Sequence, residues 1–228
     1  MKRALQFGAL GAVMGLAACV GATSNGQIGS ESVPFLEPIQ AQAAEVDSWT
    51  LGTLTLIVPE ELRVSTNPNA QFPREEIVWW GDPEGDRREQ VRDIMNRSLL
   101  AALDTLDGSK PVDVTVRLSL FHAVTPRARR NVLFAWHDVS YAVDVRDARS
   151  GALLASIPKI DADIEAFRGE QAEQAVARGQ TQRVRISQRI ASVTRDWLAS
   201  SGADLSQPGP VYQIAMTPAI LDELALAQ

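Results

Sequence analysis

The pattern that decides the fold is an alternation of apolar and polar side chains in Val112-Asp113-Val114-Thr115-Val116-Arg117-Leu118-Ser119-Leu120. Successive side chains of a strand point to opposite faces, so this pattern predicts a strand with one buried face. A second alternation runs through Val139-Ser140-Tyr141-Ala142-Val143-Asp144-Val145. We expect the two strands to form an antiparallel hairpin centred between Arg129 and Arg130, because that places the apolar residues of both on one face.

The register of this hairpin pairs particular side chains. Val116 faces Val143 on the apolar side, and Asp113 faces Arg146 on the opposite side. A slip by one residue would turn the apolar set toward the polar face, so the buried face specifies the register.

Further strands and two long helices flank the hairpin. Apolar spacing and turn residues predict strands over 49–58, 77–80 and 153–157, and amphipathic helices over 87–106 and 181–200. Asp86, with Glu89 three residues later, has the spacing of a capping box for the first helix. The order of elements predicts an α+β two-layer sandwich, with two helices on one face of a mostly antiparallel four-stranded sheet.

The N-terminus has the features of an exported lipoprotein. Lys2 and Arg3 precede a short apolar run that ends in Leu16-Ala17-Ala18-Cys19, which fits a lipobox with its lipidated cysteine. Cys19 is the only cysteine in 228 residues, so an acylation site explains it better than a disulfide within the chain. We therefore expect residues 1–18 to be a lipoprotein signal peptide and Cys19 to carry the lipid.

Composition predicts how the rest of the chain is divided. Residues 19–45 are rich in Ala, Gly, Ser, Gln and Pro and predict a flexible tether. Residues 46–202 predict the α+β domain, and residues 203–228 a tail with a short helix that starts at Thr217-Pro218. Val20 follows the cysteine where an Asp would favour retention in the inner membrane, so we expect the inner leaflet of the outer membrane, facing the periplasm.

Overall charge excludes one class of partner. The chain is 45% hydrophobic and 22% charged, as globular proteins are, and its formal net charge is −6. A nucleic-acid binder normally has a basic surplus, so we expect no nucleic-acid partner.

A basic cluster of Arg127, Arg129 and Arg130 lies at the predicted hairpin tip of this acidic chain. Guanidinium groups suit phosphates and carboxylates, so the cluster is a candidate contact for an anionic ligand such as a lipid headgroup or for an anionic partner. A solvated turn is the alternative interpretation.

The two histidines, His122 and His137, are expected to face each other near the same tip. Two imidazoles are fewer than the three or four ligands of a zinc site, so packing across the strands is the simpler interpretation. We therefore expect no metal and no other cofactor.

The segment Gly81–Arg87 combines two glycines with two aspartates. Asp82 and Asp86 could ligate a hard cation, but a turn at Asp82-Pro83 followed by a helix cap at Asp86 explains the same residues. The adjacent Trp79 and Trp80 should point to opposite faces, one into the core and one toward a contact surface. The chain has no Gly-x-Ser-x-Gly motif and no free cysteine, and no catalytic residue is predicted.

Two local sequences are similar to an uncharacterised lipoprotein family of alphaproteobacteria. They are Ile77-Val78-Trp79-Trp80-Gly81-Asp82-Pro83 with Gly85-Asp86-Arg87, and Phe121-His122-Ala123-Val124-Thr125 with Ala128-Arg129. The likeness covers about residues 45–200 and implies no known activity and no catalytic residues. The layout also resembles the lipopolysaccharide-assembly lipoprotein and the auxiliary lipoproteins of lipid-transport ABC systems.

These observations predict a non-enzymatic, outer-membrane-anchored periplasmic lipoprotein that acts as an adaptor or accessory subunit of an envelope assembly or transport system. Its partners would be the membrane, through the lipid, and an envelope protein. One alternative is a domain that binds lipid or lipopolysaccharide, which an apolar groove would distinguish. The other is an unrecognised hydrolase, which would need a cleft with a histidine beside a carboxylate.

Overall fold

The computed structural model describes residues 43–131 and 135–200. The predicted signal peptide, Cys19, most of the predicted tether and the tail from residue 203 lie outside these ranges. The elements in chain order are α1 (Ala43–Val46), β1 (Trp49–Ile57), β2 (Ile77–Val78), α2 (Arg87–Leu103), β3 (Lys110–His122), α3 (Pro126–Asn131), β4 (Trp136–Asp147), β5 (Leu153–Asp161), β6 (Ile164–Glu165), α4 (Gly169–Ala177) and α5 (Gln182–Ala199).

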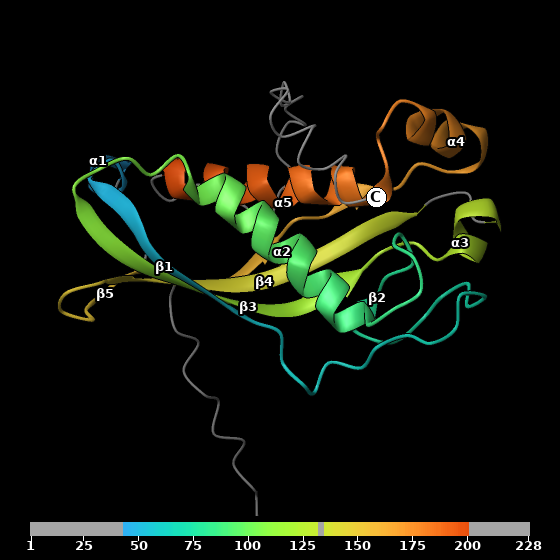
Figure 1. Ribbon diagram of the computed structural model, residues 1–228, viewed down its shortest axis with the longest axis horizontal. Helices are drawn as coiled ribbons and strands as arrows, with labels where there is room; N and C mark the ends of the chain where they lie inside the picture. The colour runs from blue at the N-terminus through green and yellow to red at the C-terminus, as the bar shows by residue number, and fades with distance from the viewer. Residues whose placement is uncertain (1–42, 132–134, 201–228) are drawn as a thin grey trace, which may run out of the picture. The chain divides into compact units, whose positions relative to one another are not determined.

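The strands of the described residues form one mixed sheet of six strands, and the prediction of a mostly antiparallel four-stranded sheet was wrong in this detail. Four of them lie in the order β1-β3-β4-β5, with β2 beside β3 and β6 beside β4 (Figure 1). Both β1 and β2 run parallel to β3. The reason is α2, whose 17 residues return the chain by about 26 Å, so β3 starts at the same end of the sheet as β1.

The central hairpin has the predicted register along most of its length. Val116 pairs with Val143 and Asp113 with Arg146. After Leu118 the register shifts by one residue, with the irregularity at Ser119, whose hydroxyl donates to the Ser140 carbonyl at 2.8 Å. A bulge of this kind adds one residue to one strand, so the partners beyond it differ from those of a regular hairpin.

Two helices, α2 and α5, cover one face of the sheet, as predicted (Figure 1). The expected apolar residues of β3 from Val112 to Leu118 and of β4 from Val139 to Val145 are buried against them, together with Ile94 and Leu99 of α2 and Ile186 and Ile190 of α5. Leu120 was expected on this face and is not, because the bulge pairs it with Ser140 of the polar face and leaves Phe121 in the core. Asp86 caps α2 by accepting from the amides of Arg88 and Glu89. Thr181 caps α5 by accepting from the Val184 amide at 3.2 Å.

The other face of the sheet is polar and has no long helix over it (Figure 1). Thr115, Arg117 and Asp144 lie there, and Asp144 accepts from the Ser156 hydroxyl at 2.6 Å. The last strand of the row, β5, continues past Pro158, where the sequence predicted its end. Pro158 lies at a register shift on an edge strand, and such a position needs no amide donor.

Candidate functional site

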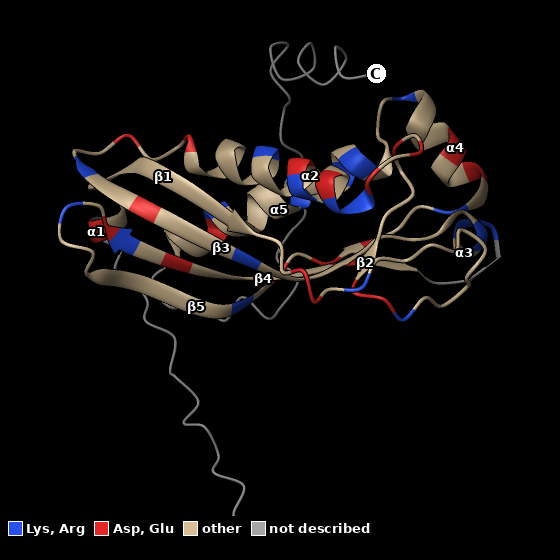
Figure 2. Ribbon diagram, turned by 60° about the horizontal axis from the view of Figure 1, so that its bottom comes forward, with Lys and Arg blue, Asp and Glu red and all other residues tan. Residues whose placement is uncertain are grey.

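The three arginines of the predicted hairpin tip lie on the short helix α3 instead of an open turn (Figure 2). The Thr125 hydroxyl accepts from the Ala128 amide at 3.1 Å, which caps this helix and explains why a turn does not form. The sequence therefore located the basic cluster correctly but not its local structure.

The arginines differ in how they are held. Arg129 is partly buried and donates to the Ala172 carbonyl at 3.2 Å, whereas Arg127 and Arg130 are exposed. Within the described part of the chain none of the three forms an ion pair. Because Arg127 and Arg130 are three positions apart on a helix, they lie on the same side and reinforce each other's positive potential.

Two exposed aromatic side chains lie at the same end of the sheet. Phe72 is 77% exposed and Trp136 is 50% exposed. The Thr125 hydroxyl donates to the Ala70 carbonyl at 2.6 Å, which holds the loop that carries Phe72 beside the start of α3. Trp136 begins β4 just after the segment that links it to α3.

Sequence reasoning missed both aromatic residues. Trp136 could have been found by extending the alternation of β4 backwards, since even-numbered residues of that strand point to the polar face. Phe72 belongs to an irregular loop, where no periodic signal exists. Arg127, Arg130, Phe72 and Trp136 are called the α3 surface below.

The two histidines do not face each other, so that expectation was wrong. The bulge at Ser119 pairs His122 with Asp138, and His137 lies on the opposite, buried side of β4. His137 is 1% exposed, and its Nδ1 accepts from the Val124 amide at 3.3 Å. Burial lowers the pKa of His137 to about 3, and the positive charges of Arg185 and Arg129 act in the same direction.

Acidic side chains surround the His122–Asp138 pair on the polar face, but each of the others has a structural partner. Asp163 accepts from the Val139 amide at 3.0 Å, and Asp161 accepts from the Ser140 hydroxyl at 2.6 Å. Burial raises the pKa of Asp138 and Asp163. Within residues 43–131 and 135–200, no three His, Cys, Asp or Glu side chains form a group that could hold a metal ion.

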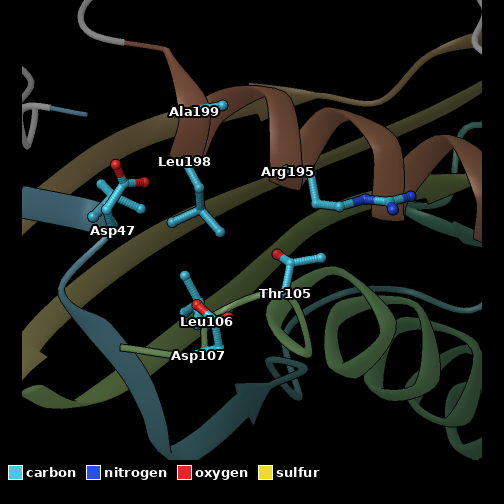
Figure 3. A pocket seen from close by; sticks show the side chains of 8 residues that line it. Asp47, Thr105, Leu106, Asp107, Arg195, Leu198 and Ala199 are labelled. Atoms are coloured by element: carbon cyan, nitrogen blue, oxygen red, sulfur yellow. The ribbon is translucent and has the colours of Figure 1, made fainter. Parts of the chain in front are cut away.

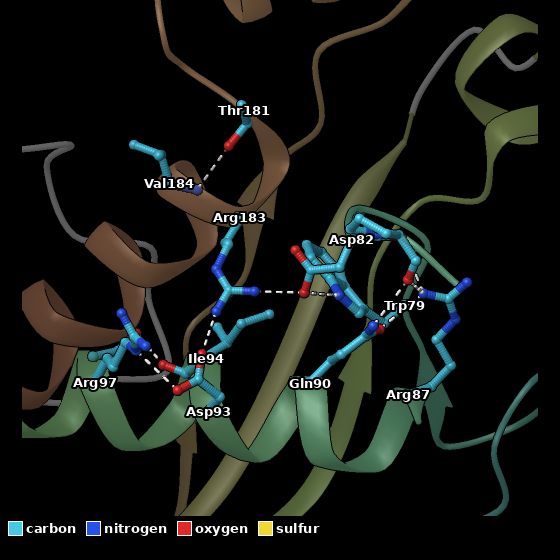
Figure 4. Close-up of polar contacts among 12 residues, drawn as sticks. Trp79, Asp82, Arg87, Gln90, Asp93, Ile94, Arg97, Thr181, Arg183 and Val184 are labelled. Carbon is cyan, nitrogen blue, oxygen red and sulfur yellow. Dashed lines mark hydrogen bonds and ion pairs between the residues drawn. The ribbon is translucent and has the colours of Figure 1, made fainter. Parts of the chain in front are cut away.

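The segment Gly81–Arg87 is a turn followed by a helix cap, and Asp82 pairs with a cation of the protein itself (Figure 4). The Trp79 indole Nε1 donates to Asp82 Oδ2 at 2.8 Å, and Arg183 donates to the same oxygen at 2.5 Å. The second Nη of Arg183 bonds to Asp93 on α2. Arg183 therefore joins α5 to both the turn and α2.

The two adjacent tryptophans divide as predicted. Trp79 is fully buried and packs edge-on against Phe121 at 5.8 Å between ring centroids. Trp80 is partly exposed, and the Arg87 guanidinium lies 4.8 Å from its ring centroid. Since the Arg87 cation already covers this ring, Trp80 is less available to a partner than Trp136.

A family model of unknown function, DUF6778, matches residues 49–213. The chain belongs to this family. Membership in DUF6778 confirms the expectation of an uncharacterised family, whereas the link to alphaproteobacteria and to the lipopolysaccharide-assembly layout stays a prediction. No curated protein matches the chain.

Two solved structures share a distant likeness with this DUF6778 member. A Xanthomonas campestris protein of the family DUF330 has a TM-score of 0.37 and 12% identity, over 67% of this chain and 82% of its own. A candidate lipoprotein from Caulobacter crescentus has a TM-score of 0.31 and 14% identity, over 71% of this chain and 98% of its own. Likenesses this distant assign no function to the chain. None of the helices in the described part of the chain has the length and apolar character required to cross a membrane.

Proposed function

We propose that this protein is a lipoprotein, held by Cys19 at the periplasmic side of the outer membrane, and that its domain is a non-enzymatic adaptor. The α3 surface is its contact with an envelope protein whose facing side is acidic. The tether predicted between Cys19 and α1 would let the domain reach a partner near the membrane, because a chain of that composition and length would span about 25–30 Å on average.

The observation that carries the proposal is the combination of unpaired arginines and exposed aromatic rings on the α3 surface. Arginine and aromatic residues are enriched in protein interfaces, where they supply most of the binding energy. An exposed cation pair on an acidic protein also favours an oppositely charged partner and speeds its approach. No other end of the described domain combines an exposed Trp or Phe with unpaired arginines.

The two alternatives have less support. A lipid binder that used the open face of the sheet would need a continuous apolar surface there, and most of the side chains on β3 and β4 at that face are polar or charged, with only Leu120, Trp136 and Ala142 among them apolar. A hydrolase would need a histidine bonded to a carboxylate, and neither described histidine makes such a hydrogen bond. The arginines would still suit lipid phosphates, so the test below distinguishes protein from lipid.

The first test is crosslinking in the intact envelope. A photo-reactive amino acid at Trp136 should give one defined protein adduct, and the same group at Arg149 should not, because Arg149 lies in the turn at the opposite end of β4. The Arg127→Ala/Arg130→Ala variant should weaken the adduct at Trp136 by at least fivefold. An adduct of lipid or lipopolysaccharide alone would overturn the adaptor proposal in favour of the lipid binder.

The second test concerns the anchor separately. Cys19→Ser should leave the precursor without lipid and outside the outer-membrane fraction, because no other residue can form the thioether. Acylation measured by labelled fatty acid, with density-gradient fractionation, gives both readouts. Normal acylation of the variant would refute the anchor without bearing on the α3 surface.

A further inference from the structure

The strand β1 forms an open edge of the sheet. It pairs with β3 on one side, and from Thr53 to Ile57 no other described segment bonds to its backbone. About half of the amide and carbonyl groups of this stretch therefore point away from the sheet. A row of such unpaired groups is a template for the addition of another strand.

The opposite edge, β5, has features that block such pairing, and β1 lacks them. β5 contains Pro158, which has no amide hydrogen, and the exposed Lys159. The sequence of β1 from Thr53 is Thr-Leu-Thr-Leu-Ile, without charge, proline or glycine. High strand propensity without charge is typical of segments that pair with other strands.

Acidic residues limit the open stretch at both ends. At the start of β1 the exposed Asp47 and Asp107 line a hollow of about 440 Å³ (Figure 3). At the other end Glu60 and Glu61 follow Pro59. An acidic strand would be repelled at either end, so the edge favours a short, uncharged strand.

The same stretch of a second copy has this character. In an antiparallel pair about a two-fold axis at Thr55, Leu54 lies opposite Leu56 of the other copy, and Thr55 lies opposite itself. Both leucines are on the core side of the sheet but are only partly buried. The pairing covers them from the side that β3 leaves open, and apolar pairs across strands stabilise a sheet.

The charges of β3 distinguish a second copy from an arbitrary strand. Thr53 is aligned with Asp113, and Ile57 with Arg117, on the polar face. In the two-fold pair Thr53 lies opposite Ile57, so Asp113 of one copy and Arg117 of the other lie in one row. An extended Arg117 side chain covers Ile57 and brings its charge toward Asp113. Within residues 43–131 and 135–200 neither charge has an ion pair.

We propose that this chain forms a two-fold dimer in which β1 pairs antiparallel with β1 of a second copy. The two sheets join into one, with the long helices of both copies on the same face. One short strand pair gives an interface at the small end for specific complexes, so we expect a dissociation constant of about 10–100 µM. This inference does not rest on the proposed function, and α3 lies away from β1 (Figure 1).

Analytical ultracentrifugation of the chain from residue 19 with Cys19→Ser tests the dimer without its lipid. Thr55→Lys places like charges opposite each other at the axis and should weaken association at least tenfold. Arg117→Asp should weaken it at least threefold, whereas Arg149→Asp, the same change on an exposed turn, should have no effect. A chain that stays monomeric at about 1 mM, ten times the weakest expected constant, overturns the proposal. Equal effects of the two arginine changes also overturn it.

Cysteine crosslinking in the same background tests the register. Residues directly opposite in an antiparallel pair have Cα atoms about 4.5–5.5 Å apart, within the range for a disulfide. Thr55→Cys should therefore give a covalent dimer under mild oxidation, and Lys159→Cys, on the other edge, at least fivefold less. Equal yields would indicate random collision and overturn the pairing. Slow hydrogen exchange of the outward amides of Thr53–Ile57 in the dilute monomer would also overturn it, because another segment of the same chain would then cover the edge.

Discussion

Two groups of arginines in this domain differ in burial and in whether they form ion pairs. Arg183 reaches from α5 to Asp82 and Asp93 and is 22% exposed, with both of its Nη atoms bonded to carboxylates. Arg127 and Arg130 of α3 are exposed and unpaired among the described residues. A paired, partly buried cation holds the fold together, whereas an unpaired, exposed one costs the fold little and remains available to a partner. The two groups are therefore expected to respond differently to substitution, and the free energy of unfolding can test this.

The largest effect is expected from Arg183→Ala. The change leaves Asp82, which is only 15% exposed, without its cation and removes the link between α5 and α2. We expect a loss of about 2–3 kcal/mol in the free energy of unfolding, measured by urea denaturation. Arg149→Ala, on an exposed turn, is the control and should change it by less than about 0.5 kcal/mol. Equal midpoints for both variants would refute a structural role for Arg183.

The next effect concerns the buried His137, which makes the stability of the domain depend on pH. Its pKa is about 3 in the folded protein, against 6.5 normally, so the unfolded chain binds the proton more readily between these values. Stability is therefore fully present above pH 6.5 and falls as the pH drops, by about 2 kcal/mol at pH 5.

The variant His137→Asn keeps an acceptor for the Val124 amide and removes the titration. Its unfolding free energy should lose most of the slope between pH 6.5 and 5, whereas His122→Asn should retain more of it, because His122 is less buried. A slope that is the same in His137→Asn and the parent would show that other groups cause the acid sensitivity.

A smaller effect is expected from Gly81→Ala. This change disturbs Trp79, which donates to the same Asp82 carboxylate as Arg183. A Cβ at Gly81 would lie 2.3 Å from the Trp79 ring, so the ring that donates to Asp82 must move. Thermal unfolding should show a loss of about 1–2 kcal/mol. At Gly85 a Cβ would meet only the side-chain nitrogen of Gln90, at 3.1 Å, so Gly85→Ala should cost less. If Gly81→Ala and Arg183→Ala act on one network, the double variant will lose less than the sum of the two.

The smallest effect on stability is expected from Arg127→Ala/Arg130→Ala. Neither side chain forms an ion pair or a side-chain hydrogen bond within residues 43–131 and 135–200, so the free energy of unfolding should change by less than about 0.5 kcal/mol. Partner crosslinking at Trp136 should nevertheless fall, as proposed above. A substantial loss of stability would show that these arginines stabilise the fold as Arg183 does, and would contradict the difference between the two groups.

Local patterns in the sequence predicted much of the fold. The alternation over 112–118 determined the hairpin register up to the bulge, and the cap at Asp86 marked the start of α2. These signals are local, because strand periodicity and helix capping depend on residues only a few positions apart. The basic cluster was found for the same reason.

The features that sequence reasoning missed depend on contacts between distant segments. The parallel pairing of β1 with β3 follows from the path of α2 across the sheet. The His122–Asp138 pair follows from the bulge at Ser119, three residues earlier in β3. The bond from Arg183 to Asp82 joins residues 101 positions apart, and no local sequence pattern predicts such a pair.

By itself, the sequence determined that the chain has a lipobox-like motif with one cysteine, an α+β domain with an alternating central hairpin, and a basic cluster at its tip. Only the tertiary structure decided which arginines are paired and which are available, because pairing is set by the positions of carboxylates brought close by packing. It likewise decided that Trp136 and Phe72 are exposed beside α3, since burial depends on what the rest of the fold covers.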